Sequence, residues 1–264
     1  SARKGSAVHP MEIDMSKRKH VFWGVVVALV AVLLPSTFAQ QSARPGPDVY
    51  SRLHWRNIGP ECNRFSAAAG IPGNPHVYYV GAASGGIYKT MDGGVNWTPL
   101  FDKQPVQSIG ALAVAPSDPN IVWAGTGEGK IRSHISVGQG VYRSLDAGKS
   151  WTLMGLEKTG RIPRVVIDPK DPNVVLVCAL GHAYGPQPER GVFRTADGGQ
   201  SWNRVLFVDE NTGCSDIAMD GANPRVLFAG MWQLEIHTWG RESGGPGSGL
   251  FVSRDGGVTW ARLT

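Results

Sequence analysis

Side chains that could bind or cleave a ligand gather in three segments of unlike sequence, 128–139, 181–190 and 233–248. Arginine binds carboxylate and phosphate groups through paired hydrogen bonds, and an exposed aromatic ring offers a flat apolar surface. The segments therefore predict a site for a glycan, a peptide or an anionic group, unless their polar residues are ordinary solvated loop residues. The candidate ligand-binding residues are Glu128, Arg132, His182, Arg190, His237, Trp239 and Arg241.

Catalysis and metal binding have less support in these segments. Glycosidase chemistry needs two carboxylates about 5 to 10 Å apart across a cleft. Glu128 is the candidate catalytic acid, but one carboxylate is not a pair. His182 and His237 have no third ligand at a recognisable spacing, so we expect no metal site. We also expect no cofactor, because the chain contains no nucleotide-binding or nucleophile motif.

One eight-residue motif recurs four times and organises the chain. It reads (S/T)-x-D-(G/A)-G-x-(S/T/N)-W and occupies residues 90–97, 144–151, 195–202 and 253–260, which we call the boxes. A repeat of about 50 residues is typical of propellers and solenoids. Each repeat also contains three short apolar runs separated by turns, so it predicts four short antiparallel strands. The expected fold is an all-β propeller of four-stranded blades, with four blades present.

Four copies of one motif indicate a structural part rather than four active sites. The box lies between the third and fourth strands, where an aspartate can accept N–H groups of its own turn. The following glycine permits backbone angles that a side chain disfavours, and the tryptophan packs on the sheet and donates its N–H to a carbonyl. The predicted structural residues are Asp92, Trp97, Asp146, Trp151, Asp197, Trp202, Asp255 and Trp260.

The boxes resemble the Asp-box or BNR repeat of sialidases, family-74 glycoside hydrolases, sortilin-type receptors and photosystem assembly factors. Further phrases are similar to those of exported bacterial proteins described as sortilin-like or as BNR-repeat glycosyl hydrolases. These phrases are WRNIGP (55–60), SIGALAVAPSDPN (108–120), GTGEG (125–129) and GGPGSGL (244–250). The resemblance covers residues 53–264 and implies a ring with more blades, of which this chain would be a fragment or an open arc.

Two departures from the related enzymes bear on activity. Family-74 hydrolases carry one acid in the first blade, in a phrase like TDxGGxY. The matching phrase in this sequence is AASGGIY (82–88), with Ala83 at the acid's position, which puts this type of cleavage in doubt. RIP at 161–163 resembles the sialidase arginine motif, but it follows the second box instead of preceding the first. We therefore do not expect a sialidase.

The N-terminal region is predicted to be an export signal. Residues 15–20 are basic, an apolar run of 14 residues (21–34) follows, and Thr37 and Ala39 fit a cleavage pattern. We interpret 1–14 as an upstream artefact, 15–39 as the signal peptide and 40–52 as a linker. The apolar run is short of the roughly 20 residues that span a membrane, although an uncleaved anchor is the alternative. The expected location is periplasmic or extracellular.

Charge and cysteine content limit the remaining classes. The net charge of +5 lies mostly in residues 1–40, and the rest of the chain carries 21 basic and 19 acidic residues. This near balance argues against a nucleic-acid partner. Cys62, Cys178 and Cys214 are odd in number, so free or buried thiols are favoured over a single disulfide pair.

The three variable segments are expected to share one face of the propeller. In a blade, the turn between strands 1 and 2 lies at the same end as the box, and the strand 2–3 loops lie at the other. Repeat frameworks usually carry function on their variable face. We predict an exported scaffold that binds a protein, a peptide or a glycan there, and a glycoside hydrolase is the alternative. An open blade edge could also pair with another chain.

Overall fold

The structure is a computed structural model that describes residues 59–60, 64–132 and 134–264. The predicted upstream segment, signal peptide and linker (1–52) lie outside the described residues, as does Cys62. Residues Asn57–Thr264 form one compact unit. In the described part of the chain, no helix has both the length and the apolar character needed to cross a membrane.

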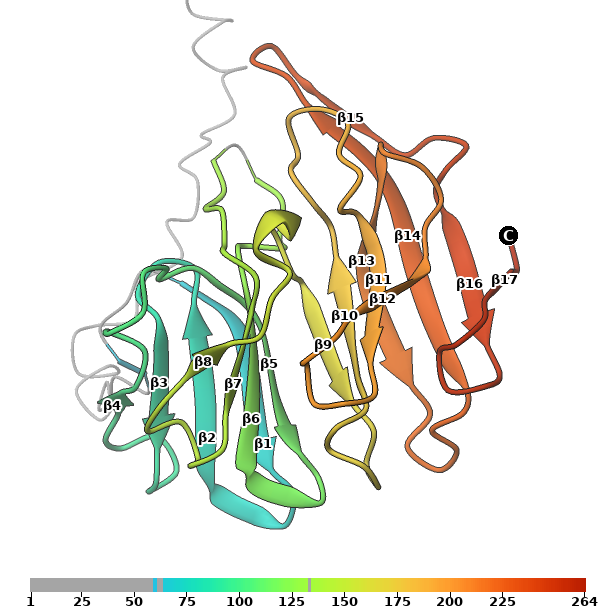
Figure 1. Cartoon of the computed structure of the whole chain (residues 1–264). Helices are drawn as coiled ribbons and strands as arrows, with labels where there is room; N and C mark the ends of the chain where they lie inside the picture. Colours follow the sequence, from blue (N-terminus) through green and yellow to red (C-terminus); the bar gives the residue numbers. More distant parts are fainter. Residues whose placement is uncertain (1–58, 61–63, 133) are drawn as a thin grey trace, which may run out of the picture. The chain divides into compact units, whose positions relative to one another are not determined.

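Four antiparallel sheets follow one another along the chain, each with its strands in chain order (Figure 1). Blade 1 contains β1 (Phe65–Ile71), β2 (Asn74–Ala82), β3 (Ile87–Thr90) and β4 (Thr98–Pro99). Blade 2 contains β5 (Ile109–Ala115), β6 (Asp118–Thr126), β7 (Val141–Ser144) and β8 (Thr152–Leu153). A short 3-10 helix, η1 (Glu157–Thr159), leads to blade 3.

The second half of the unit repeats this arrangement. Blade 3 contains β9 (Arg164–Ile167), β10 (Val175–Ala179), β11 (Gly191–Thr195) and β12 (Asn203–Leu206). Blade 4 contains β13 (Thr212–Met219), β14 (Leu227–Ile236), β16 (Gly249–Ser253) and β17 (Ala261–Arg262). A further strand, β15 (Arg241–Ser243), pairs with the end of β14 and extends this sheet. The predicted all-β fold with four four-stranded blades is confirmed.

The apolar core lies between neighbouring blades, because the sheets of blades 2 and 3 bury both of their faces. Successive residues of a strand point to opposite faces. In β10, Val175 and Val177 therefore pack in the cluster shared with blade 2, while Leu176 and Cys178 pack in the cluster shared with blade 4. The first strands β1, β5, β9 and β13 are neighbours in succession. A continuous apolar run is thus the pattern expected of a strand inside the stack.

Each box holds its own turn through its hydroxyl residue and its aspartate. In the second box, the Ser144 hydroxyl donates to Asp146 at 2.8 Å, and Asp146 accepts the Ser150 amide at 2.8 Å. The Gly148 amide donates to the Ser144 hydroxyl at 2.7 Å. The same three contacts occur in the other boxes. Donors from Ser150 lower the pKa of Asp146 to about 2, and the box therefore uses the charged carboxylate.

The residue after each box aspartate has a left-handed backbone. It is glycine in three boxes, whereas the second box has Ala147 with φ 58°. The amide of this residue donates to the turn between the first two strands, as from Ala147 to the Asn120 carbonyl at 2.8 Å. The boxes and the strand 1–2 turns therefore lie at one end of each blade, and the strand 2–3 loops leave from the other end.

A cation three residues before the box aspartate ties each blade to the next one. We call these residues the latch cations. Their side chains donate to the carbonyl after the next box aspartate: Lys89 to Ala147 at 3.2 Å, Arg143 to Gly198 at 3.1 Å and Arg194 to Gly256 at 3.0 Å. Blade 4 has Val252 at the equivalent position.

A disulfide joins Cys178 in β10 to Cys214 in β13, with an S–S distance of 2.06 Å. The expectation of free thiols is therefore wrong for these two residues. The fold explains the pair, because it sets the second strand of blade 3 against the first strand of blade 4, although 36 residues separate the cysteines. Both side chains are buried in the core between these blades.

Candidate functional site

The three variable segments meet in one apolar cluster at the end of the blades opposite the boxes. Ile135 comes from the first segment, Ala183 from the second and Leu234 from the third, and all three side chains are buried together. The Ile236 amide also donates to the Ala183 carbonyl at 2.6 Å. The segments therefore form one continuous surface, which we call the loop face.

Glu128 lies beneath the loop face as a buried counter-ion. Its side chain has no exposed surface, and it forms ion pairs with Arg64 and Arg132. Arg132 binds both carboxylate oxygens, through Nε at 3.0 Å and through its second terminal nitrogen at 3.3 Å. A catalytic acid has to reach the bond that it protonates. The geometry therefore supports a structural role for Glu128 and gives a catalytic role no support.

Ala83, which stands where the resemblance to family-74 hydrolases implies a first-blade acid, lies beside this cluster. Ala83 is buried, and its amide donates to the Arg64 carbonyl at 2.9 Å. Arg64 in turn pairs with Glu128. Arg64 therefore links Ala83 to the Glu128 carboxylate, which is already paired with the guanidinium groups of Arg64 and Arg132.

Two arginines are completely buried and hold the loops in place. Arg190, a predicted ligand-binding residue, donates to the carbonyls of Gly185 at 2.9 Å and Leu234 at 3.1 Å, and also to those of His182 and Asn211. Arg161 donates to carbonyls of two loop segments. Burial lowers the pKa of both guanidinium groups. Arg190 therefore positions the backbone around it, and it offers no exposed donor to a ligand.

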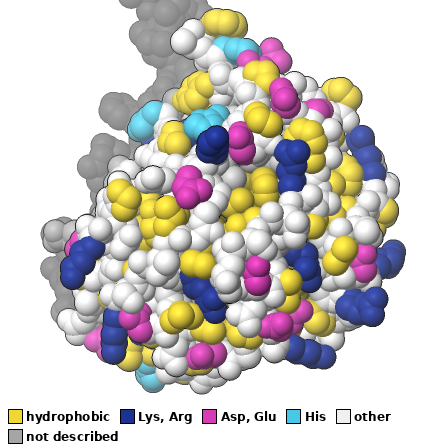
Figure 2. All heavy atoms as spheres, in the orientation of Figure 1, with side chains coloured by type: hydrophobic (Ala, Val, Ile, Leu, Met, Phe, Trp, Pro, Cys, Tyr) yellow, Lys and Arg dark blue, Asp and Glu magenta, His cyan; other side chains and the backbone are white. Residues whose placement is uncertain are grey.

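A groove of ≈ 570 Å³ opens on the loop face between the first and third variable segments. Three of the predicted ligand-binding residues line it: Arg132 and His237, which are half-buried, and Arg241, which is exposed. Residues Ile131, Arg132, Ile236, His237, Thr238, Gly240 and Arg241 line it. Figure 2 shows hydrophobic, histidine and acidic side chains together at the end of the molecule where Figure 1 places β15. The groove thus joins a loop of blade 2 to the β14–β15 hairpin of blade 4.

Trp239 and His237 form a flat aromatic platform beside this groove. The two rings are stacked, with centroids 4.8 Å apart and planes 5° from parallel. Trp239 is 83% exposed, so the face of its indole ring that does not stack on His237 is open to solvent. An aromatic ring exposed in this way offers a large flat apolar surface that a ligand could cover. The platform is the feature of the loop face most suited to a ligand.

Carboxylates flank the histidine of the platform. Glu235 Oε1 lies 3.7 Å from His237 Nδ1, and Glu242 Oε1 lies 3.5 Å from Nε2. His182 is exposed on the second segment. Across the described residues, no group of three or more His, Cys, Asp or Glu is arranged to hold a metal ion.

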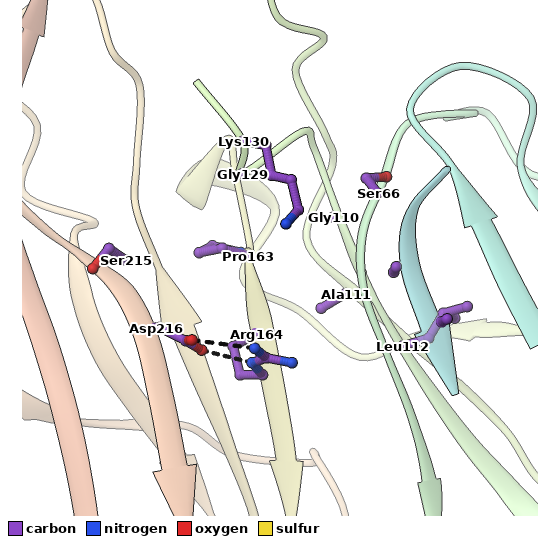
Figure 3. A pocket seen from close by; sticks show the side chains of 12 residues that line it. Ser66, Gly110, Ala111, Leu112, Gly129, Lys130, Pro163, Arg164, Ser215 and Asp216 are labelled. Atoms are coloured by element: carbon purple, nitrogen blue, oxygen red, sulfur yellow. Dashed lines mark hydrogen bonds and ion pairs between the residues drawn. The ribbon is translucent and has the colours of Figure 1, made fainter. Parts of the chain in front are cut away.

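A second, smaller cavity lies along the first strands of the blades. It has a volume of ≈ 180 Å³ and includes Ser66, Ala111, Arg164 and Asp216, one from each blade. Arg164 Nε donates to Asp216 at 2.6 Å, and these hydrogen bonds lower the pKa of Asp216. Figure 3 shows the Lys130 side chain on the loop side of this ion pair. The pair cannot be predicted from the sequence of one repeat, because Arg164 and Asp216 belong to strands of different blades.

Comparisons with known proteins place the chain near a group of polysaccharide-degrading enzymes. No family model matches the sequence. The chain is 23% identical to a xyloglucanase of Paenibacillus sp over 211 residues, 73% of this chain and 20% of that protein. It is 26% identical to the xyloglucanase Xgh74A of Acetivibrio thermocellus over 210 residues, 69% of this chain and 23% of that protein.

A solved structure shows the same fold. The crystal structure of an ancestral GH74 enzyme superposes with a TM-score of 0.60 at 23% identity, covering 80% of this chain and 27% of that one. This chain therefore spans about a fifth to a quarter of the length of these curated relatives. The sequence and fold similarities together show a distant homology to GH74 xyloglucanases.

Proposed function

We propose that this chain is a glycan-binding part of an exported propeller protein, and that a polysaccharide binds along the loop-face groove. The observation that carries the proposal is the exposed platform of Trp239 stacked on His237. An aromatic ring can pack against the apolar C–H face of a sugar, and nearby arginines can donate to its hydroxyl groups. Arg132 and Arg241 line the groove beside the platform.

Two further observations support this proposal. The curated relatives are named xyloglucanases, so a β-glucan with side chains is the first ligand to test. The disulfide between Cys178 and Cys214 is typical of proteins that fold in an oxidising compartment, which agrees with export. A sortilin-like scaffold for a protein or peptide would use the same face, and it is the reading that remains if no glycan binds.

Hydrolysis is the second candidate function, and one geometric observation favours it. Glu235 and Glu242 lie 3.7 Å and 3.5 Å from opposite nitrogens of the His237 ring, so two carboxylates are close together, as glycosidase chemistry requires. Against it, the two residues are cross-strand partners on one hairpin and do not face each other across a cleft. The resemblance of AASGGIY (82–88) to the family-74 phrase also implies an acid at the position that Ala83 occupies. We therefore rank binding above cleavage.

The test is a titration of the full chain with xyloglucan and with xyloglucan oligosaccharides, measured by calorimetry. We expect Trp239→Ala to weaken binding about fivefold to tenfold, because stacking on one ring is worth about 1 to 1.5 kcal/mol and a factor of ten corresponds to about 1.4 kcal/mol. The matched control is Tyr184→Ala, which removes a ring that is 57% exposed on the same face but does not line the groove. The control should bind like the wild type.

The same samples are assayed for released reducing ends. Release that disappears in Glu242→Gln would replace the binding proposal by the hydrolase. Absence of binding to every neutral glucan tested would contradict the proposal, and equal affinity of Trp239→Ala and wild type would contradict the location of the site.

A further inference from the structure

The cavity of ≈ 180 Å³ along the first strands contains charged side chains that the repeat does not require. We call it the inner cavity. One position of the first strand, defined by its partner in the second strand, is occupied in blades 1 to 4 by Ala67, Ala111, Arg164 and Asp216. Blades 1 and 2 keep the same strand pairing with alanine at this position. The fold itself therefore does not need the ion pair that blades 3 and 4 place there.

The ion pair between Arg164 and Asp216 fixes the orientation of the guanidinium group. The two side chains are 52% and 60% exposed, and ion pairs exposed to this extent usually add little to stability. Arg164 Nε and Nη2 donate to the two carboxylate oxygens at 2.6 Å and 3.2 Å, and pairing through both nitrogens holds the guanidinium plane. Asp216 does not use the remaining nitrogen, Nη1. Figure 3 shows a nitrogen of Arg164 on the side of Ala111 and Leu112, away from Asp216.

Lys130 supplies a second cation on the loop side of the inner cavity. This exposed residue follows β6 and lines the cavity together with Gly129. Figure 3 shows its amino group pointing toward Arg164. The hydrogen bond from Arg164 is the main cause of the lowered pKa of Asp216, and the charge of Lys130 lowers it further. Lys130 thus lies close enough to act on the ion pair, and the two cations face the same space.

The other side chains of the wall leave these two cations as the donors for a ligand. The Ser66 hydroxyl donates to the carbonyls of Gly81 and Ile109. The Ser215 hydroxyl donates to the Gly230 carbonyl at 3.0 Å. Both hydroxyl protons are therefore engaged with the backbone. The apolar part of the wall comes from Ala67, Ala68, Ala111, Leu112 and Pro163.

We propose that the inner cavity binds a small organic acid, with its carboxylate between the Lys130 amino group and Arg164 Nη1 and its carbon atoms against the alanine side chains. Two cations and the Asp216 carboxylate leave one net positive charge, which a single carboxylate balances. The apolar wall favours a ligand with carbon atoms over an inorganic oxyanion. The volume equals that of roughly six water molecules, so a carboxylate with a short carbon chain fits.

The experiment is an NMR titration of the isotope-labelled full chain with sodium butyrate, read from the methyl signals of Ala67 and Ala111. Ionic strength is held constant, because salt screens exposed charges. We expect a saturable shift with a dissociation constant in the millimolar range. Butyramide has the same shape without the charge, and it should bind at least about tenfold more weakly. Inorganic phosphate, the third probe, should also bind more weakly than butyrate.

Three glutamine variants and one loop-face variant locate the site. Lys130→Gln and Arg164→Gln should each raise the butyrate dissociation constant at least about fivefold, since each removes one charge-assisted hydrogen bond. The matched control Lys149→Gln removes the same charge from an exposed lysine in the box of blade 2 and should bind like the wild type. Melting temperatures should stay close to that of the wild type, because the replaced side chains are largely exposed. Trp239→Ala should leave butyrate affinity unchanged, since the inner cavity and the loop-face groove share no lining residue.

Each of the following results would overturn the proposal. The first is the absence of a saturable shift of the Ala67 and Ala111 signals at millimolar butyrate. The second is equal affinity of Lys130→Gln and wild type, and the third is equal affinity for butyramide and butyrate. Tighter binding of phosphate than of butyrate would refute the assignment to an organic acid.

Discussion

Removal of the disulfide between Cys178 and Cys214 should cost a large part of the stability of the protein. The replacement Cys178→Ala with Cys214→Ala suits this test, because both side chains are completely buried among apolar residues and alanine adds no polar group. The bridge closes a loop of 36 residues. The chain-entropy model gives about 4 kcal/mol for a loop of this length. The expected loss in free energy of unfolding is thus about 4 kcal/mol.

Guanidinium unfolding followed by tryptophan fluorescence measures this loss. Wild type and double variant are compared without reductant, and the midpoint and the slope are fitted together, since a change in slope alone would report a change in the denatured state. The single variant Cys178→Ala serves as a control for packing. It removes the bridge as well but keeps the Cys214 sulfur in the core, so it should lose no more stability than the double variant, and the difference measures the packing of that sulfur.

Counting thiols supplies the result that would refute the reasoning. The chain has three cysteines, so the denatured, unreduced protein should show one reactive thiol and the reduced protein three. Three thiols before reduction would show that the bridge does not form. One thiol combined with equal stability of variant and wild type would instead refute the assignment of about 4 kcal/mol to loop closure.

Three further predictions concern the boxes. Ala147→Gly should raise the free energy of unfolding by up to about 1 kcal/mol, because this alanine has φ 58° where the other boxes have glycine, and an unchanged denaturation midpoint would contradict this. Asp146→Ala should lower the free energy of unfolding by about 1 to 3 kcal/mol, because it removes the hydrogen bonds that this carboxylate accepts. Glycan affinity per folded molecule should not change. A loss of affinity at unchanged stability would contradict the structural role. Hydrogen bonds lower the pKa of Asp92 and Asp146 to about 2, below their unfolded values, so their contribution is complete above about pH 4 and is lost as pH falls through about 2. The melting temperature should fall over this range, and less so in Asp146→Asn.

The fold could be predicted from the sequence because its determinants are local. Each box closes its turn with residues at most four apart, such as Ser144, Asp146 and Ser150, so the pattern is visible in every repeat. The latch cations recur just as regularly, three residues before the box aspartate in blades 1 to 3, so they are visible when the repeats are written one below another. Their role could not be predicted, because Lys89, Arg143 and Arg194 donate to the following blade and the sequence of a single repeat does not show that contact.

The candidate site was predictable only in part, because burial on the loop face depends on contacts between repeats. Glu128 and Arg190 have the residue types of a binding site, yet the structure buries both. Trp239 and Arg241 have equally polar surroundings in the sequence, and the structure exposes them. The disulfide between Cys178 and Cys214 could not be predicted either, because it depends on which strands of neighbouring blades face each other.

The two ends of the blades therefore tolerate change differently. At the box end, hydrogen bonds inside one segment fix each turn, and the latch cations add one hydrogen bond between a box and the preceding blade. At the loop end, Arg190 binds carbonyls from both sides of the second segment and from Leu234 of the third. The hairpin that carries Trp239 begins at Leu234, so its position depends on the buried Arg190 side chain. Under the proposed function, the exposed residues Trp239 and Arg241 would set ligand specificity on this face, while the buried arginines keep the surface in place.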